Sequence, residues 1–333
     1  MFRIWIRMVL LGLIFLFLSC GDGKKSEVTT KKISIAVIPK GTTHEFWKSI
    51  HAGAIKAGRE LQVEVIWKGP LKEDDREAQI SVVENFITGG VSGIVLAPLD
   101  ETALMMPVNN AKRAGIPVVI IDSGLKGSDY LSYIATNNKL GGELAGKRLA
   151  ELLQGKGKVI MLRYQEGSAS TFLRETGFLE VIQQYPEIQV VSSNQFAGAT
   201  TETAYRASEN VLAPFKTSDG RLAIDGIFCP NESSTFGMLR ALQDANLAGK
   251  VRFMGFDSSP KLIEALEKND LDGLVLQNPF KMGYLGVKTM VDYLKNQSYE
   301  NFIDTGVTLV TRENMNQPEI HELIMPDLSQ WFN

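Results

Sequence analysis

Residues 116–124 read IPVVIIDSG, and this stretch predicts the fold. The run from Val118 to Ile121 is continuously β-branched, which is typical of a strand covered on both faces in a parallel sheet. Asp122 then lies at the carboxyl end of that strand, where open α/β sheets bind their ligands. A second stretch, VRFMGFD at 251–257, ends on Asp257 in the same way. We expect these two carboxylates to face each other across one site.

Apolar strands alternate with amphipathic helices on both sides of this stretch, and the connections are short. Such alternation predicts parallel sheets with right-handed crossovers. The alternation of strands and helices begins again near residue 136. We therefore expect an α/β fold of two doubly wound, parallel-sheet (Rossmann-like) domains. The expected strands cover residues 33–38, 63–67, 93–98, 117–121, 131–135, 158–162, 188–192, 224–228, 251–256, 271–276 and 305–310. The expected helices are one that follows a capping box of Thr42 and Glu45 and runs to Leu61, then 75–88 and 101–114, one that follows Asn137-Asn138 and runs to Leu153, and then 170–184, 201–212, 233–246, 260–268 and 280–295.

Composition and charge exclude some classes of partner. The chain has 333 residues, of which 44% are hydrophobic and 22% charged, as in ordinary globular proteins. This length favours two domains over one. The formal net charge is −3, and Lys and Arg form no block in any segment. We therefore expect no nucleic-acid partner.

The first 19 residues read as an export signal rather than as part of the fold. Arg3 and Arg7 precede an apolar run at 9–18 that is short for a membrane span. An uncleaved membrane anchor is the alternative. The sequence FLSC at 17–20 resembles the lipobox of bacterial lipoproteins, which implies that Cys20 is acylated and becomes the mature N-terminus. Residues 20–32 are polar and aperiodic, which predicts a lipidated tether.

Cys229 is the other cysteine of the chain, and it lies in the apolar run IFCP. If Cys20 carries lipid, Cys229 has no partner for an intrachain disulfide. We expect it to fill the core rather than to react as a thiol.

Polar and aromatic side chains follow the expected strands, at positions that a parallel sheet brings to one edge. They are Lys40, His44, Phe46 and Trp47 after the first strand, Asp122 and Ser123 after strand 117–121, Arg174 after strand 158–162, and Asn231, Asp257 and Gln277 after three later strands. Carboxylates, amides and a guanidinium offer paired hydrogen-bonding groups that match vicinal hydroxyls. Aromatic faces add stacking against the apolar face of a sugar. Together these residues predict a pocket for a neutral sugar or polyol.

Each of these residues also has a structural interpretation. Asp and Asn after a strand often cap the next helix. Phe46 and Trp47 fit the core, and His44 and Arg174 fit a solvated surface. The prediction of a pocket rests on the coincidence of all of them at one edge.

Signals for catalysis, metal binding or cofactor binding are weak. The glycines at 141, 142 and 146 do not form a GxGxxG, and 155–158 lacks the spacing of a phosphate-binding loop. His44, His51 and His321 lack metal-ligand spacing, and no serine lies in a GxSxG. We expect no catalytic residues, no metal and no cofactor.

Several segments together resemble the periplasmic sugar-binding proteins of ABC importers, of the type I fold and the ribose/galactose-binding group. The resemblance covers residues 33–310, and its segments are THEFWKSIHAGA, VVIIDSGLKG, ATNNKLGGELAG, FLRETGF, FCPNESSTFGMLRAL, FMGFDSSP and LVLQNPFKMG. It implies a protein that binds a sugar between two domains, closes around it and docks on a membrane permease. It further implies a monomer located in the periplasm or at the cell surface.

The resemblance assigns roles to the residues at the strand ends. Phe46 and Trp47 match the aromatic pair that stacks on the sugar. The polar contacts of the family match Asp122, Arg174, Asn231, Asp257 and Gln277. His44 and Ser123 depart from the family, which has Asn and often Arg there, so the identity of the sugar stays open. Lys40, in the sequence IPK, resembles a ligand contact of the autoinducer-2 and rhamnose-type branch. A second-domain aromatic of many members aligns loosely with Phe196.

The resemblance also implies a three-strand hinge with crossings near Thr136, Asn278 and Val307. The expected N-terminal domain is 33–135 plus 279–306, and the C-terminal domain is 136–278 plus 307–325. One alternative is a sensor subunit that presents a sugar or an autoinducer-2-type ligand to a membrane receptor. A repressor effector domain would need an N-terminal helix-turn-helix, and residues 1–32 show a signal and a tether there instead.

Overall fold

The computed structural model describes residues 32–332. The predictions for the export signal, for the acylation of Cys20 and for the tether up to residue 31 therefore lie outside the described residues.

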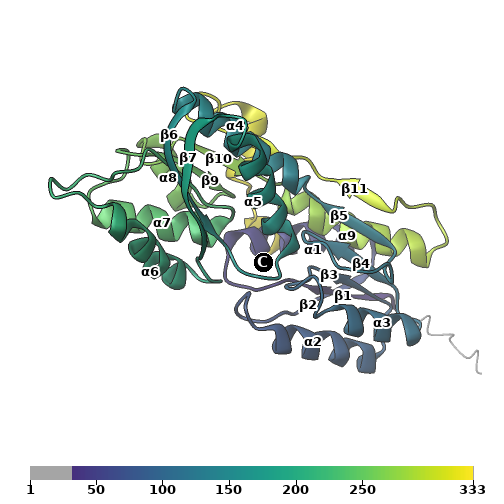
Figure 1. Ribbon diagram of the computed structural model, residues 1–333. Coiled ribbons are helices and arrows are strands. Elements are labelled where there is room, and N and C mark those ends of the chain that lie inside the picture. Colours follow the sequence, from purple (N-terminus) through teal and green to yellow (C-terminus); the bar gives the residue numbers. More distant parts are fainter. Residues whose placement is uncertain (1–31, 333) are drawn as a thin grey trace, which may run out of the picture. The chain divides into compact units, whose positions relative to one another are not determined.

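The first lobe is a parallel sheet with helices on both faces (Figure 1). Its strands are ordered β11-β5-β4-β3-β1-β2. Their bounds are β1 (Ser34–Ile38), β2 (Glu64–Trp67), β3 (Gly93–Leu96), β4 (Val118–Ile121), β5 (Ser132–Ala135) and β11 (Phe302–Asp304). Helices α1 (Glu45–Leu61) and α9 (Pro279–Leu294) pack on one face, and α2 (Arg76–Gly89) and α3 (Met105–Arg113) on the other.

The second lobe repeats this plan with a mixed sheet of order β12-β10-β9-β8-β6-β7. Its strands are β6 (Lys156–Arg163), β7 (Glu187–Phe196), β8 (Gly226–Phe228), β9 (Arg252–Phe256), β10 (Gly273–Leu276) and β12 (Thr308–Val310). Helices α4 (Asn138–Leu152) and α5 (Ala169–Ile182) cover one face. The other face packs against α6 (Thr201–Leu212), α7 (Glu232–Asp244), α8 (Pro260–Glu267) and α10 (Pro318–Ile324). Short 3-10 helices follow α6 and α10, η1 (Ala213–Phe215) and η2 (Ser329–Trp331).

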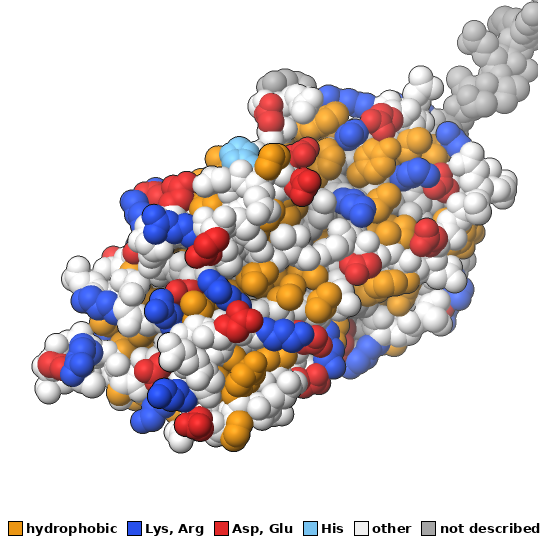
Figure 2. Space-filling view, turned by 90° about the horizontal axis from the view of Figure 1, so that it is seen from above, with side chains coloured by type: hydrophobic (Ala, Val, Ile, Leu, Met, Phe, Trp, Pro, Cys, Tyr) orange, Lys and Arg blue, Asp and Glu red, His pale blue; other side chains and the backbone are white. Residues whose placement is uncertain are grey.

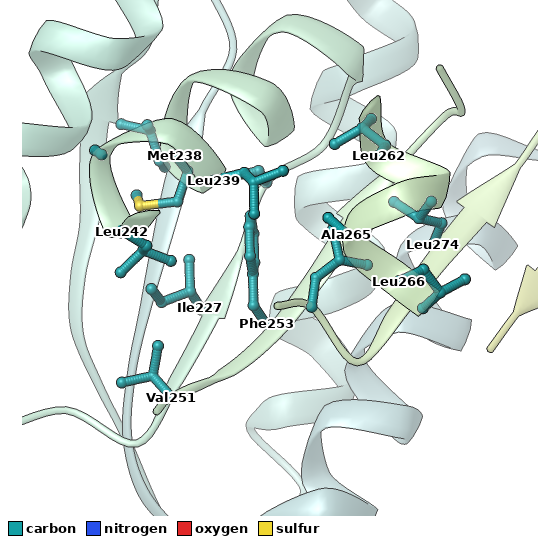
Figure 3. Packing of buried hydrophobic residues seen from close by; sticks show 14 of the residues in the cluster. Ile227, Met238, Leu239, Leu242, Val251, Phe253, Leu262, Ala265, Leu266 and Leu274 are labelled. Atoms are coloured by element: carbon teal, nitrogen blue, oxygen red, sulfur yellow. The ribbon is translucent and has the colours of Figure 1, made fainter. Parts of the chain in front are cut away.

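The apolar runs of the central strands explain this layering. In β4, Val119 and Ile121 pack toward α1 and α9, whereas Val118 and Ile120 pack toward α2 and α3. Successive side chains of a strand point to opposite faces, so a strand between two helical layers must be apolar throughout. Figure 3 shows part of the corresponding core of the second lobe, where Phe253 of β9 lies among leucines of α7 and α8. The predicted fold of two α/β units is confirmed.

The chain passes between elements of the two lobes at several points. It does so between β5 and α4, between β10 and α9, and between β11 and β12. The predicted final strand over 305–310 is confirmed only over Thr308–Val310, which form β12, antiparallel to β10. Residues 305–307 connect it to β11, which was not predicted and pairs with β5 in the other sheet. Gly306, with φ +94, lies between them in a conformation that favours glycine.

Two helix starts also differ from the prediction. The helix expected over 101–114 begins only at Met105, because Asp100 Oδ1 accepts hydrogen bonds from the amides of Thr102 and Ala103 and holds them in a separate turn. The capping box of Thr42 and Glu45 is not formed. The N-cap of α1 is His44, and the Thr42 hydroxyl donates to the carbonyl of Pro70 instead.

The surface carries charges of both signs. On the face shown in Figure 2, Lys and Arg side chains are interspersed with Asp and Glu. Within residues 32–332, every helix is too short or too polar to cross a membrane.

Candidate functional site

A cavity of about 320 Å³ lies where the strand ends of the two lobes meet. The first lobe contributes Lys40, His44, Phe46, Trp47, Glu73 and Asp122 to its lining. The second lobe contributes Tyr164, Ser170, Thr171, Arg174, Asn231, Glu232, Asp257 and Gln277.

The structure thus brings together the predicted site residues, apart from Ser123. Ser123 is fully buried next to the lining, and its hydroxyl accepts a hydrogen bond from the amide of Ser170 at 3.2 Å. Phe196, which aligned loosely with a family aromatic, lies away from the cavity. It is 42% exposed and its ring packs under the guanidinium of Arg163 at 4.8 Å.

The two strand-end aspartates have the same backbone conformation. Asp122 follows β4 with φ 62, and Asp257 follows β9 with φ 65, so both adopt the left-handed region that is unusual outside glycine. The amide of each donates to a carbonyl at the neighbouring strand, Ile134 for Asp122 and Val275 for Asp257. Neither residue caps a helix. This geometry directs both carboxylates into the cavity from opposite lobes.

Lys40 neutralises Asp122 within the first lobe. Its ammonium lies 3.1 Å from the Asp122 carboxylate, and both side chains are buried. It also donates across the cavity to the hydroxyls of Ser168 and Ser170, at 3.3 and 3.1 Å. With these partners the three ammonium donors of Lys40 are satisfied by protein groups.

Glu73 organises the other side of the first lobe. Its carboxylate is bonded to the His44 ring, to the Trp47 indole N–H at 2.6 Å and to the Tyr164 hydroxyl at 2.6 Å. Burial alone would lower the pKa of His44, but the charge and hydrogen bond of Glu73 raise it to about 9. Burial alone would raise the pKa of Glu73, but His44, Lys40 and Tyr164 lower it to about 2. His44 and Glu73 therefore form a charged pair at neutral pH.

Phe46 and Trp47 form an edge-to-face pair in the first turn of α1, with ring centroids 5.0 Å apart. Trp47 is 2% exposed and belongs to the core of the first lobe as well as to the lining of the cavity, and Phe46 is half-buried. The hydrogen bond to Glu73 fixes the orientation of the Trp47 ring. Trp47 thus belongs to the core and also lines the cavity.

Arg174 is buried rather than solvated. Helices α4 and α5 approach closely at Gly142 and Gly177, where an added Cβ would lie 1.9 Å from the Arg174 carbonyl and 2.2 Å from the Lys139 carbonyl. This contact lets Arg174 donate to Asn138 Oδ1 at 2.8 Å and to the carbonyl of Pro230 at 2.9 Å. Its guanidinium also stacks on Phe256 at 4.0 Å. The guanidinium is thus fixed at 3.8 Å from Asp257.

Asp257 is paired less tightly than Asp122. It accepts hydrogen bonds from the Gln277 amide at 2.8 Å and from the backbone N–H of Glu232 at 3.2 Å. Burial raises the pKa of Asp257, although Arg174 and Gln277 act in the opposite direction. The carboxylate therefore gains from any further donor that reaches it in the cavity.

Gln277 offers an unused acceptor beside Asp257. Its amide nitrogen donates to Asp257, whereas its Oε1 atom is buried and accepts no hydrogen bond from residues 32–332. A buried acceptor of this kind costs free energy until a donor such as a hydroxyl reaches it.

Asn231 confirms the capping interpretation in part. It is the N-cap of α7 and accepts from the amide of Ser234 in a capping box, while it also lines the cavity. The next residue, Glu232, bonds across the cavity to the amides of Glu45 and Phe46. Burial raises the pKa of Glu232 to about 7, against the effect of His44.

Three pairs of opposite charge line the cavity, and Glu232, whose pKa burial raises to about 7, stands outside them. Lys40 faces Asp122, His44 faces Glu73, and Arg174 faces Asp257. A charged ligand would leave one of these groups unpaired in a buried place, which is costly. The arrangement suits a small neutral molecule with several hydroxyls. Within residues 32–332 no cluster of His, Cys, Asp and Glu could hold a metal ion.

Sequence reasoning missed Glu73, Tyr164, Ser170, Thr171 and Glu232. Glu73 lies in an acidic loop, EDD at 73–75, whose three carboxylates cannot be told apart in sequence. Glu232 follows Asn231 directly, and this position shortly after a strand was the one feature of the sequence that could have indicated it as a site residue.

A second cavity of about 770 Å³, partly open to solvent, lies beside the first and shares Phe46, Asp257 and Gln277 with it. Much of its wall is apolar and comes from the C-terminal segment, including Leu323, Ile324 and Met325. It lacks the paired charges of the smaller cavity, which is therefore the candidate site.

Known proteins share this fold and much of this sequence. Residues 35–298 match the family model of the periplasmic binding protein domain. The D-allose-binding periplasmic protein of Escherichia coli is 28% identical over 270 residues, which cover 78% of this chain and 84% of that protein. The ribose import binding protein of Bacillus subtilis is 27% identical over 284 residues, or 85% of this chain and 88% of that protein.

Solved structures agree. A carbohydrate transporter solute binding protein of Agrobacterium radiobacter in complex with D-arabinose has 33% identity and a TM-score of 0.84, and the match covers 89% of this chain and 100% of that one. An ABC transporter solute binding protein of Agrobacterium vitis with bound D-fucose has 34% identity and a TM-score of 0.83, with 88% and 100% covered. The chain therefore belongs to the periplasmic binding protein family, as the sequence resemblance predicted.

Proposed function

We propose that this protein captures one small neutral sugar or sugar-like polyol between its two lobes and delivers it to an ABC permease. The observation that carries the proposal is the cavity itself, which is lined from both lobes by hydrogen-bonding groups and by three pairs of opposite charge. Relatives and solved neighbours named for D-allose, ribose, D-arabinose and D-fucose support a monosaccharide.

The proposed contacts come from both lobes. Asp257 and the Oε1 atom of Gln277 accept from hydroxyls, because one is a poorly paired carboxylate and the other an unused acceptor. The free donors of Arg174 and Asn231 bind hydroxyl oxygens, and the faces of Phe46 and Trp47 pack on the C–H face of the ring. Lys40, His44 and Asp122 complete the wall.

Capture works by closure of the lobes about the connections near Thr136, Asn278 and Val307. A ligand that contacts both lobes stabilises the closed arrangement by its differential affinity for it. The closed arrangement then presents a surface made of both lobes to the permease. The sugar leaves unchanged.

A thermal-shift panel tests the sugar proposal. Pentoses, hexoses, deoxysugars and polyols are compared with the matched sugar acids and sugar phosphates. A neutral sugar present at 100 times its Kd should stabilise the protein by about 2.7 kcal/mol. The charged analogues should give no shift. Failure of every neutral sugar, or an equal shift with its acid or phosphate, would contradict the proposal.

The lipid anchor is a further part of the proposal. Acylation of Cys20 would attach the protein to the outer face of a membrane, in the periplasm or at the cell surface. Cys20→Ala should release the protein from membranes or block its processing, whereas Cys229→Ser, at the buried core cysteine, should leave the attachment intact. Mass spectrometry of the mature protein should find lipid at Cys20. An unmodified N-terminus at another residue would contradict the lipid anchor.

A further inference from the structure

Helices α1 and α5 occupy equivalent places in the two lobes. Each follows the first strand of its lobe, β1 or β6, and each begins at the cavity. The first amides of a helix have no partner within the helix, so an acceptor must come from elsewhere. At most other helices of the described residues the N-cap side chain provides it, as in α2, α4, α6, α7, α8 and α9.

The N-caps of α1 and α5 do not provide it. His44 and Ser168 make no side-chain capping bond. The same holds for α3 and α10, whose first residues lie outside the lining of the cavity. His44 is engaged with Glu73, and the Ser168 hydroxyl accepts from Lys40.

The missing acceptors come from the opposite lobe in both cases. Glu232 of the second lobe accepts from the amides of Glu45 and Phe46, at 3.4 and 3.3 Å. Ser123 of the first lobe accepts from the amide of Ser170 at 3.2 Å. Each lobe thus caps the first helix of the other.

We propose that Glu232 and Ser123 are closure residues, which cap α1 and α5 across the cleft only when the lobes are together and so raise the affinity for the sugar. This inference rests on the proposed function, because it needs an open state in which the caps are broken. In that state the amides of α1 and α5 turn to water, so the caps add to the stability of the closed state alone.

The two caps should differ in strength. Glu232 brings a carboxylate with two bonds to the positive end of α1, whereas Ser123 brings one neutral hydroxyl to α5. Loss of a cap weakens a helix start by an amount that corresponds to between about twofold and about thirtyfold in an equilibrium constant. We expect Glu232→Ala to weaken sugar binding toward the upper end of this range and Ser123→Ala toward the lower end. Glu232→Gln, which keeps an acceptor, should lose less than Glu232→Ala.

Thr200→Ala is the matched control. Thr200 caps α6 within its own lobe, through the amide of Thr203 on the surface. Its loss should lower the stability of the sugar-free protein and leave the affinity unchanged. The cross-lobe variants should show the reverse, because their bonds are absent from the open state.

The test combines calorimetry with amide exchange read residue by residue by NMR. The probe is whichever of D-ribose, D-allose, D-arabinose and D-fucose binds the wild-type protein most tightly. Sugar should slow exchange at Phe46 and Ser170. In Glu232→Ala the protection should be lost at Phe46 and kept at Ser170, and in Ser123→Ala the pattern should be reversed.

Two outcomes separate this inference from the proposed function. If the wild-type protein binds no sugar or polyol of the thermal-shift panel, the proposed function fails, and the inference falls with it because it needs a state closed by ligand. If the sugar binds but Kd and exchange at both amides are the same in the variants as in the wild-type protein, the caps do not contribute to closure and the inference is overturned.

Discussion

Asp122 and Asp257 occupy equivalent positions in the two lobes but have different surroundings. Both follow a buried strand, with φ 62 and 65, and both donate their amide to the neighbouring strand. Asp122 is paired with the Lys40 ammonium at 3.1 Å. Asp257 is 3.8 Å from the Arg174 guanidinium, and burial raises its pKa.

This difference indicates a division of roles. The carboxylate of the first lobe is matched by a close cation, which also bonds to Ser168 and Ser170 of the second lobe. It holds the wall of the site together. The carboxylate of the second lobe is paired less closely and lies beside the unused Oε1 atom of Gln277. In the proposed function it gains most from the hydroxyls of a sugar.

The largest expected effect is on folding stability, at Asp122. Asp122→Asn leaves the buried Lys40 ammonium without its counter-ion, and breaking a buried ion pair costs about 3–5 kcal/mol. Urea denaturation of the sugar-free protein should detect this loss. The double variant Asp122→Asn/Lys40→Met should recover part of it, because it removes the unpaired charge. A loss at Asp257→Asn as large as that at Asp122→Asn would remove the distinction between the two lobes.

The next effect is on binding, at Asp257. Asp257→Asn keeps the size of the side chain but replaces one carboxylate oxygen with a donor. A hydrogen bond to a charged group is worth about 1.5–3 kcal/mol, so the affinity should fall tenfold or more. The melting temperature without sugar should change little, because the charge lost is one that burial already disfavours. If calorimetry finds the wild-type affinity in Asp257→Asn, then Asp257 does not contact the sugar and has a structural role only.

A smaller effect concerns pH and the pair of His44 and Glu73. The pKa of His44 rises from 6.5 to about 9 on folding, so the folded chain holds an extra proton between these values. Its contribution to stability is complete below pH 6.5 and is lost as the pH rises through 9. Glu73 contributes above pH 4.5 and loses its contribution as the pH falls toward 2. The pair therefore stabilises the first lobe most between pH 4.5 and pH 6.5.

Between pH 7 and 9 His44 makes the largest contribution to the pH dependence of stability. Glu232, whose pKa is about 7, titrates at the lower end of this window, and His51, whose pKa is lowered to about 4 by burial, titrates outside it. The free energy of unfolding should fall across this window in the wild-type protein and in His51→Asn. The fall should be smaller in His44→Asn. An equal fall in His44→Asn would show that the pair does not titrate as described.

The sequence predicts the fold well where local pattern and tertiary environment agree. The β-branched run at Val118–Ile121 can be stable only between two helical layers, and that is where it lies. The C-terminal strands show the opposite case. The strand expected over 305–310 forms only at Thr308–Val310, and β11 (Phe302–Asp304) was missed, because it is short and largely exposed and its pairing with β5 is decided by tertiary contacts that spacing does not encode.

The site residues likewise fall into those that the sequence predicts and those that it does not. Residues that directly follow a strand, such as Asp257 and Gln277, were predictable because parallel strands deliver their ends to one edge. Glu73 was not, because it reaches the cavity from a loop after the edge strand β2. The roles of Ser123 and Glu232 depend on amides of the opposite lobe, more than 40 residues away for one and more than 180 for the other. No local pattern records such pairs.

The central claim is that a sugar held by both lobes closes them. Small-angle scattering of the wild-type protein, with and without a saturating sugar whose binding has been confirmed by calorimetry, tests it most directly. The account predicts a smaller radius of gyration with the sugar than without it. An unchanged radius at confirmed saturation would contradict closure as the means of capture.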